Sequence, residues 1–517
     1  MPGPSLPQPS SAKSAVSAAR KYTGRTPRLR VLMVSSEATP WAKTGGLADV
    51  LGGLPAALVR LGHSVTVVLP KYRGVTIQPT DTVEGDVVLG QVRHHVAWHQ
   101  QVTAEGVRMV FVECDALYDR DGLYGVGGRD YPDNADRFAV LAAATLEVGE
   151  RERGGGATIV HAHDWQGGLV AALLRTQPQR WPRLAKAGLV FTIHNLAYQG
   201  RFPRETVPRL GLDWRVFTME GAEFWNELSY LKAGVAYSDY VTTVSPQYAG
   251  ETLTPEFGCG FEGALEALGE RYIGILNGID TGVWNPETDP YLPAHFSAAA
   301  LAGKRECKRE LLHRFGLPQG DDALARPVIA MVSRLVSQKG LDWVHQASDQ
   351  LMALDATWVV VGSGDRQYEQ MWQNLHDRHP SRVGVFLGFD EARAHLAEAG
   401  ADMFLMPSRF EPCGLNQMYS LRYGTVPIVH GVGGLADTIR TYRPNARHAN
   451  GFKFTSPSAA AMVVAVRQAV RLFGNKVQWR RLMSSGMTDD HSWDQAAREY
   501  VKVYKRARRD ARDLRSA

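Results

Sequence analysis

The sequence predicts an α/β protein made of two doubly wound domains that face each other across a deep cleft. Short apolar runs alternate with helical patterns along nearly the whole chain, which is typical of parallel sheets covered by helices. The alternation stops at residues 291–325 and then resumes. The chain has 517 residues, which is too many for one hydrophobic core.

The first domain is predicted over residues 28–290. Seven apolar runs in it are expected to be strands: Leu29–Ser35, Ser64–Leu69, Val107–Cys114, Thr158–His163, Gly188–His194, Tyr240–Ser245 and Ile273–Leu276. Several are nearly continuous in Val, Ile and Leu, as parallel strands buried on both faces are. Segments between them, such as Leu54–Leu61, have apolar residues at helical spacing.

Residues 291–325 are expected to connect the domains because they contain Pro293, Pro318 and a charged helix near Lys304–Arg314. The second domain is predicted over residues 326–490. Its expected strands are Val328–Val332, Thr357–Gly362, Val383–Leu387, Met403–Met406 and Val426–Val429. Residues 491–517 read as a basic helix that packs back on the first domain. Two such domains place a ligand crevice at the carboxyl ends of their strands.

Composition excludes several classes of protein. The net charge of +5 is not concentrated in one tract, so we expect no nucleic-acid partner. No apolar run is long enough for a membrane span. Four scattered cysteines without a CxxC pair indicate a reducing compartment, and we expect the cytoplasm. Residues 1–27 are basic, rich in Ser and Ala, and read as a disordered extension; a plastid transit peptide is the alternative.

A glycine-bearing junction follows the first strand of the first domain. It spans Lys43–Asp49, and Gly45 and Gly46 allow close approach of a ligand to the backbone. The free N–H groups at a helix start can bind phosphate, and Lys43 adds a positive charge. A helix cap beside a surface lysine is the alternative interpretation.

Histidines mark the ends of the next two strands. His161 and His163 share one face of a strand, and Asp164 and Trp165 follow them. A metal site lacks an evident third ligand, so a hydrogen-bonded histidine pair or a sugar contact by Asp164 and Trp165 remains. His194 ends the following strand, where it could bind a sugar hydroxyl or belong to the core.

The second domain carries candidate anion-binding residues. Arg334 and Lys339 flank a short loop after a strand and could neutralise phosphate, unless they form a solvated surface pair. Glu411 precedes a glycine-bearing helix start, where it is either a cap or a crevice carboxylate. Gly433–Asp437 repeats the pattern of the first junction. The dinucleotide fingerprint GxGxxG fails because Gln367 replaces its third glycine.

Taken together, these strings resemble the bacterial glycogen synthase and plant starch synthase family. The matching segments, in the family's order, are Lys43–Val50, Val160–Gly168, Phe191–Gly200, Leu231–Gly234, Thr242–Pro246, Ile275–Asp280, Ser333–Asp342, Pro407–Gln417 and Gly433–Thr438. The resemblance implies a GT-B fold and retaining transfer of glucose from ADP-glucose to the 4-hydroxyl end of an α-1,4-glucan. It implies no metal and no other cofactor.

The resemblance also assigns roles. It implies catalytic roles for Glu411, His194, Arg334 and Lys339. The implied substrate-binding residues are Lys43, Gly45, Gly46, Asp49, Asp164, Trp165, Asn195, Asn277, Cys413, Gly414 and Leu415. Two positions depart from the family pattern. Asn416 replaces a frequent Thr, which bears on phosphate contact, and His430–Val432 replaces a more basic or Thr-containing stretch, which could alter the acceptor or the nucleotide pocket.

Two other functions remain open at this point. One is a GT-B transferase that uses UDP-glucose or a different acceptor. The other is a catalytically weak glucan-binding protein, which the presence of Lys43, His194, Arg334, Lys339 and Glu411 disfavours. A retaining hydrolase would need two close carboxylates. Because the chain offers one prominent candidate, Glu411, we expect departure and attack on the same face of the sugar.

Overall fold

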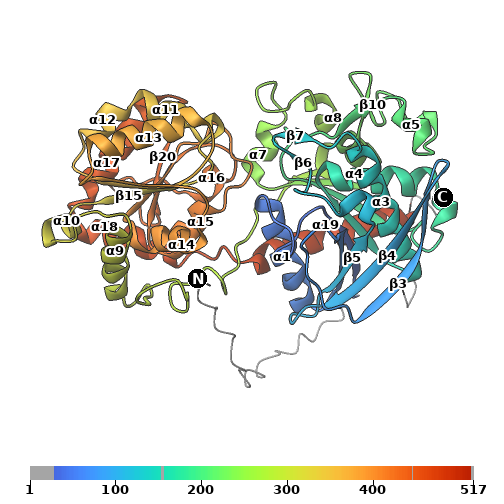
Figure 1. The fold of residues 1–517 in the computed structure, drawn as a ribbon, viewed down its shortest axis with the longest axis horizontal. Coiled ribbons are helices and arrows are strands. Elements are labelled where there is room, and N and C mark those ends of the chain that lie inside the picture. Colours follow the sequence, from blue (N-terminus) through green and yellow to red (C-terminus); the bar gives the residue numbers. More distant parts are fainter. Residues whose placement is uncertain (1–27, 153–155, 445, 514–517) are drawn as a thin grey trace, which may run out of the picture.

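The structure is a computed structural model that describes residues 28–152, 156–444 and 446–513. The predicted disordered extension at 1–27 lies outside the described residues. The described chain forms two lobes side by side, each built around its own sheet (Figure 1). The predicted architecture of two doubly wound α/β domains is confirmed. Within the described ranges, no helix is long and apolar enough to cross a bilayer.

The first lobe contains a nine-stranded sheet in the order β14-β13-β9-β8-β1-β2-β5-β4-β3. Its parallel strands are β1 (Arg30–Val34), β2 (Ser64–Pro70), β5 (Arg108–Glu113), β8 (Ile159–His163), β9 (Gly188–Ile193), β13 (Tyr240–Thr243) and β14 (Tyr272–Gly274). These are the seven predicted strands, with ends that differ by at most two residues.

The remaining two strands of this sheet were not predicted. β3 (Asp81–Leu89) and β4 (Val92–Val102) form an antiparallel hairpin at the sheet edge. In β3 only Val87 and Leu89 are buried, so the segment lacks the apolar run on which the other predictions were based. Its charged, exposed face suits an edge strand that must not pair with another chain.

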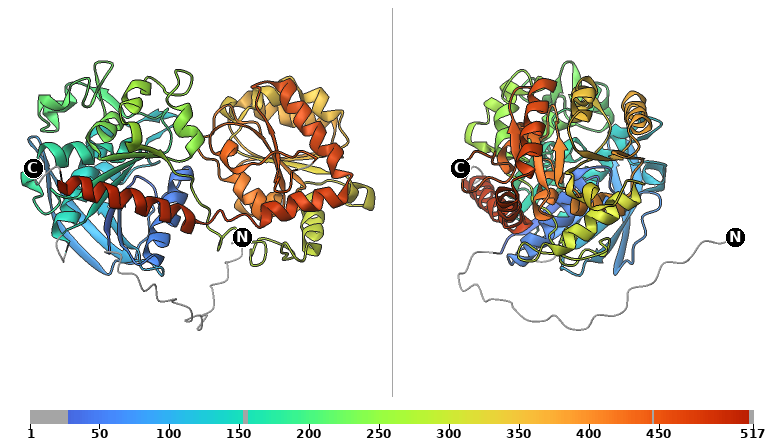
Figure 2. Two further views of the ribbon diagram at one scale, coloured as in Figure 1. Left: turned by 180° about the vertical axis from the view of Figure 1, so that it is seen from behind. Right: turned by 90° about the vertical axis from the view of Figure 1, so that its left-hand side faces the viewer.

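Helices cover both faces of the first sheet. On one face, α3 (Asn134–Arg151) and α4 (Asp164–Thr176) pack against Val34 and Val68 in a large apolar core. On the other face, α1 (Gly46–Arg60) lies beside α19 (Trp493–Asp513). Figure 2 shows α19, the last helix of the described chain, running along the first lobe.

The apolar stripe of α19 explains its position. Tyr500, Val503 and Tyr504 are buried against strand residues such as Met33 and Val190, while the basic residues of the helix point outward. The helix therefore supplies part of the core of the first lobe, although it lies more than 200 residues away in the sequence from most of that lobe.

The second lobe contains a six-stranded parallel sheet in the order β17-β16-β15-β18-β19-β20. Its strands are β15 (Val328–Val332), β16 (Thr357–Gly362), β17 (Val383–Leu387), β18 (Met403–Met406), β19 (Val426–His430) and the short, unpredicted β20 (Phe452–Phe454). Helices α13 (Arg366–Arg378) and α17 (Ala459–Phe473) cover one face. On the other face, α9 (Ala302–Arg314), from the predicted connector, packs against α14 (Glu391–Gly400).

The chain crosses between the lobes twice. The outgoing and returning segments run side by side, with the Ile279 amide bonded to the His491 carbonyl at 2.8 Å. Beyond this point, the Trp284 ring is stacked between His395 and Tyr419 of the second lobe, with 3.8 Å between ring centroids on each side. The outgoing segment is therefore anchored on the second lobe from Trp284 onward.

Candidate active site between the lobes

The first glycine junction is organised by Glu37, which follows the carboxyl end of β1. The buried Glu37 carboxylate accepts hydrogen bonds from the Thr44 amide (2.6 Å), the Thr44 hydroxyl (2.5 Å) and the Gly45 amide (3.3 Å). The Tyr124 hydroxyl donates to the same carboxylate at 2.5 Å. Glu37 was missed by the sequence reasoning, although its place directly after a buried strand was a usable signal.

Lys43 and Asp49 are the first and last residues of this junction, and their side chains form an ion pair. The Lys43 ammonium is 2.6 Å from the Asp49 carboxylate, and the lysine side chain is half exposed. Burial raises the pKa of Asp49, and the nearby Lys43 charge opposes that rise. Both residues line a cavity of about 770 Å³ between the lobes, to which Tyr419 of the second lobe also contributes.

The two predicted junctions meet across the cleft. A methyl group added at Gly46 would lie 3.8 Å from the Leu415 side chain. Leu415 precedes α15 (Asn416–Arg422) and packs against the core of the first lobe. The structure therefore brings Gly46 of the first junction next to Leu415 at the end of the second.

The three histidines pack together at the ends of β8 and β9 but belong to two separate hydrogen-bonded groups, with 4.0 Å between the ring centroids of His161 and His163. His161 contacts the Tyr504 hydroxyl at 2.8 Å and the Thr192 hydroxyl at 2.6 Å, and His163 Nδ1 lies 3.0 Å from His194 Nε2. Burial lowers the pKa of His161 and of His194 to about 3, so both rings are neutral near pH 7. Over the described ranges, no cluster of side chains could hold a metal ion.

Asp164 stands at the carboxyl end of β8 in a left-handed backbone conformation, with φ of 52°. Its carboxylate accepts the His194 amide at 2.7 Å, which links the ends of neighbouring strands. Enclosure by protein raises the Asp164 pKa to about 7, against the opposing effect of hydrogen bonds from the His194 and Asn195 amides. The Asn195 side chain closes the following turn by accepting the Ala197 amide at 3.1 Å.

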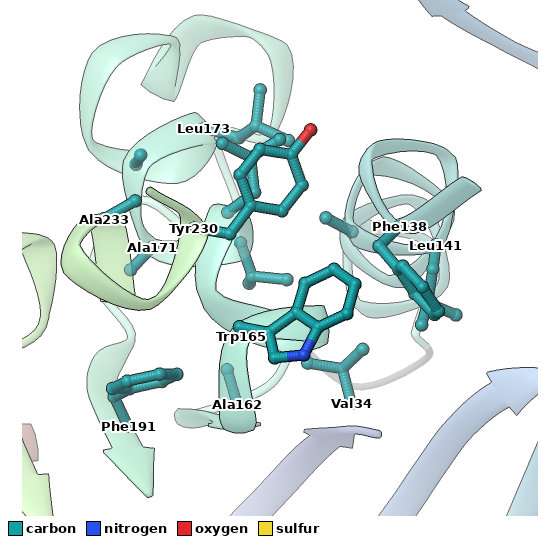
Figure 3. Close-up of a cluster of buried hydrophobic side chains, with 14 of the residues drawn as sticks. Val34, Phe138, Leu141, Ala162, Trp165, Ala171, Leu173, Phe191, Tyr230 and Ala233 are labelled. Carbon is teal, nitrogen blue, oxygen red and sulfur yellow. The ribbon is translucent and has the colours of Figure 1, made fainter. Parts of the chain in front are cut away.

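The structure does not place Trp165 in the cleft. Its indole lies in the hydrophobic core, edge-on to Phe138 at 4.9 Å between ring centroids and close to Phe202 at 5.8 Å (Figure 3). Because α4 begins at Asp164, the helical turn directs the next side chain toward α3. The predicted sugar contact by Trp165 is therefore wrong, and its role is packing.

Glu411 and Lys339 form the centre of the second-lobe site. Lys339 Nζ is 2.5 Å from Glu411 Oε2, and the Ser408 hydroxyl donates to the same oxygen at 2.9 Å. They line a cavity of about 140 Å³, to which Ser333 and Gly414 also contribute. Glu411 is 7% exposed. Most of its side chain is therefore shielded from solvent, and its carboxylate is bonded to Lys339 and Ser408.

Asn416 lines the same cavity, and Arg334 directly follows Ser333, which also lines it. Arg334 is exposed and donates to the Gln338 side chain at 3.2 Å, so its guanidinium remains accessible to an anion. Asn416 lines the cavity, and its side-chain amide donates to the Val332 carbonyl at 2.7 Å. The residue that departs from the family pattern therefore joins the start of α15 to the end of β15.

Gly414 allows the chain to turn beside Glu411. It has a φ of +70°, and an added side chain would lie 2.6 Å from Gln417 Oε1 and 3.1 Å from Glu411 Cγ. Burial raises the pKa of the Cys413 thiol to about 12, so Cys413 is not a thiolate nucleophile. Cys413 lies against the backbone of Asn277, whose buried Oδ1 has no hydrogen-bond partner among the described residues.

These features define a class of protein. Two doubly wound lobes, with charged residues at facing strand ends, are the architecture of a GT-B glycosyltransferase. Residues 30–267 match the family model for the starch synthase catalytic domain, and residues 319–479 match the model for glycosyl transferases group 1.

Individual relatives agree with these models. The chain is 48% identical over 490 residues to a glycogen synthase of Anaeromyxobacter dehalogenans. The alignment covers 92% of this chain and 99% of that relative. It is 45% identical to a glycogen synthase of Koribacter versatilis, with coverage of 93% and 98%. The chain therefore belongs to the glycogen synthase and starch synthase family.

Solved structures give the same result. The catalytic domain of starch synthase IV from Arabidopsis thaliana, bound to ADP and acarbose, superposes with a TM-score of 0.84 at 32% identity and covers 93% of this chain and 99% of that chain. A sucrose-phosphate synthase from Thermosynechococcus elongatus superposes with a TM-score of 0.55 at 16% identity over the same shares, and it shares the fold alone.

Proposed function

We propose that the protein transfers glucose from ADP-glucose to the non-reducing 4-hydroxyl of an α-1,4-glucan, with retention of configuration. The observation that carries this proposal is the Lys339–Glu411 pair in the second-lobe cavity, with the accessible Arg334 nearby. Family membership supports glucosyl transfer. The relative of known structure that is bound to ADP and acarbose supports the nucleotide and the acceptor class.

The two cations suit a leaving diphosphate. Negative charge builds on the diphosphate as the bond to glucose breaks, and fixed positive groups in a site with little water stabilise that charge without reorganising. Arg334 can bind two phosphate oxygens at once, and Lys339 supplies a point charge deeper in the cavity. Glu411, held by Lys339 and Ser408, is placed to accept hydrogen bonds from hydroxyls of the transferred glucose.

The environments of the two carboxyls support same-face attack over a glycosyl-enzyme intermediate as the route to the proposed retention. Asp164 is bonded to a backbone amide and keeps its proton up to a pH of about 7, because enclosure raises its pKa to that value. Glu411 is paired with Lys339. Both carboxyls are thus engaged with protein groups, which favours attack by the acceptor on the face that the diphosphate leaves over a glycosyl-enzyme intermediate.

Incorporation of radiolabelled glucose into glycogen tests the proposal, with ADP-glucose and UDP-glucose compared side by side. We expect transfer from ADP-glucose to exceed transfer from UDP-glucose, and proton NMR of a short-chain product to show α-linkages alone. Preferred use of UDP-glucose would favour the other GT-B transferase considered above. No transfer from either donor would refute the proposal.

We also propose a cytoplasmic location. The scattered cysteines support it, since the four are all unpaired. The relatives named above that come from bacteria support it as well.

A further inference from the structure

Two short helices from different lobes are in contact, and a carboxylate of each helix accepts a hydrogen bond from the first turn of the other. Helix α7 (Pro246–Glu251) follows β13 in the first lobe, and α16 (Gly433–Thr438) follows β19 in the second. The Gln247 amide, at the start of α7, donates to Asp437 Oδ2 at 2.9 Å. The Gly433 amide, at the start of α16, donates to both Glu251 oxygens at 2.9 and 3.2 Å. Each helix thus receives a cap from the opposite lobe.

The same contact reaches the backbone of Glu411. Gly433 has a φ of +44°, and an added side chain would lie 1.9 Å from the Glu411 carbonyl oxygen. The next amide, that of Gly434, donates to this oxygen and to the Pro412 carbonyl at 3.2 Å each. The start of α16 is therefore packed directly on the Glu411–Pro412 peptide.

The first lobe contacts the next peptide group, between Pro412 and Cys413. The Ser245 hydroxyl, fully buried at the end of β13, donates to the Pro412 carbonyl at 2.7 Å. Ser245 also accepts the Tyr248 amide at 3.1 Å and so caps α7. The Pro412 carbonyl is therefore held by a hydroxyl from one lobe and by an amide from the other.

We propose that Glu251 is a positioning residue for the transfer reaction: its carboxylate, through the start of α16, and Ser245 together hold the backbone carbonyls of Glu411 and Pro412 in place across the boundary between the lobes. This inference rests on the proposed function, because Glu411 is assigned to the transferred glucose there. Glu251 acts through the Gly433 amide and touches no group assigned to the donor.

The arrangement predicts a specific kinetic effect. The two donor cations, Arg334 and Lys339, belong to the second lobe and do not contact Glu251. Removing the Glu251 carboxylate should therefore leave nucleotide binding nearly intact. It should disturb the position of Glu411 relative to His194 of the first lobe, which is an alignment that matters in the transition state. The loss should appear in kcat and not in donor affinity.

The test compares three variants. We expect Glu251→Ala to lower kcat about tenfold or more, while the Kd for ADP, measured by calorimetry, stays within about twofold. Glu251→Gln keeps an oxygen acceptor for the Gly433 amide and should recover most of the activity. Glu256→Ala removes an exposed glutamate five residues away and should behave as the unaltered protein does.

A kcat for Glu251→Ala equal to that of the unaltered protein would overturn the inference. Equal losses of kcat and ADP affinity would also overturn it, since they would indicate general damage to the site. Hydrogen exchange gives a readout independent of turnover: peptides containing Glu411–Leu415 should exchange faster in Glu251→Ala but not in Glu256→Ala. If the protein transferred no glucose at all, the proposed function would fail, and unchanged exchange would separately refute the positioning role.

Discussion

Replacing Asp164 by Asn is expected to stabilise the folded protein at neutral and alkaline pH while it lowers turnover. The carboxyl is enclosed at the end of β8 and accepts the His194 amide at 2.7 Å. An Asn side chain can accept the same hydrogen bond through its carbonyl oxygen. What the substitution removes is the negative charge, which the protein environment disfavours, as the raised pKa of Asp164 indicates.

The direction of the pH effect follows from where the proton is held. The pKa of Asp164 rises from its ordinary value of 3.8 to about 7 on folding. Between these values the unfolded chain has lost the proton and the folded chain has kept it, so stability falls as the pH rises through this window. Below pH 3.8 both states are protonated and the carboxyl imposes no penalty.

The size of the effect follows from the same shift. A change of roughly 3 pKa units corresponds to a ceiling of about 4 kcal/mol, at 1.36 kcal/mol for each unit. Because Asp164 keeps some contact with solvent, screening reduces this ceiling, and we expect a difference of about 1–2 kcal/mol. The full difference should be present above pH 7 and should shrink as the pH falls toward 4.

Urea unfolding of the unaltered protein and of Asp164→Asn, at pH 5 and at pH 8, measures this difference. The unfolding midpoint of the variant should exceed that of the unaltered protein by more at pH 8 than at pH 5. If the midpoints of the two proteins differed by the same amount at pH 5 and at pH 8, the reasoning would be refuted. That result would mean that the pKa of Asp164 is not raised in the folded state.

Four further outcomes are expected. Glu411→Ala should lower kcat on the order of a hundredfold, whereas Lys339→Ala should weaken ADP-glucose binding about tenfold; steady-state kinetics and calorimetry separate the two effects, and near-normal turnover of folded Glu411→Ala would contradict its role. Gly433→Ala should destabilise the protein by about 2 kcal/mol or more, because the added methyl group would clash with a backbone carbonyl at a residue of positive φ. Thermal unfolding measures this loss, with Gly250→Ala, in open space on α7, as the control. Equal stability of the two variants would argue against the clash. Trp284→Ala should lower the free energy of unfolding of the second lobe by about 2 kcal/mol, because two ring contacts are lost. An unaltered urea midpoint would show that the stack does not stabilise the contact between the outgoing segment and the second lobe.

The parallel strands were predictable because their sequences are nearly continuous apolar runs. Strands such as β8 and β9 are buried on both faces, and that burial leaves an unambiguous signal. The β3–β4 hairpin was missed for the opposite reason, since it lies at the edge and exposes most of one strand. β20 has three residues, which is too short to produce a pattern.

The site was predictable where it depends on strand ends and less so where it depends on packing. His194 and Asp164 follow neighbouring buried strands, so their proximity follows from the topology. Trp165 was assigned wrongly because its position next to Asp164 suggested the cleft, while the helix that begins there directs it into the core. Glu37 was overlooked because its partners, the Thr44 and Gly45 amides, are backbone groups without a sequence signature.

The individual hydrogen bonds that Ser245 and α7 of the first lobe make with the second lobe could not be predicted from the sequence. Ser245 and Pro412 are separated by 167 residues, and Glu251 and Gly433 by 182. No local pattern records such pairs, because each residue alone is compatible with an ordinary helix cap. They depend on how the two sheets face each other, which is a property of the whole fold.

The residues of the candidate site are divided between the two lobes. The groups suited to the diphosphate, Arg334 and Lys339, lie in the second lobe, whereas His194 and Asp164 lie in the first. The proposed transfer requires both sets to be correctly placed around one sugar. With two lobes, the cleft can receive the glucan, while the Glu251 carboxylate bonded to the Gly433 amide sets the position of Glu411 when the lobes are engaged. In the proposed reaction, the position of the Glu411 carboxylate is then determined by residues of both lobes and not by its own domain alone.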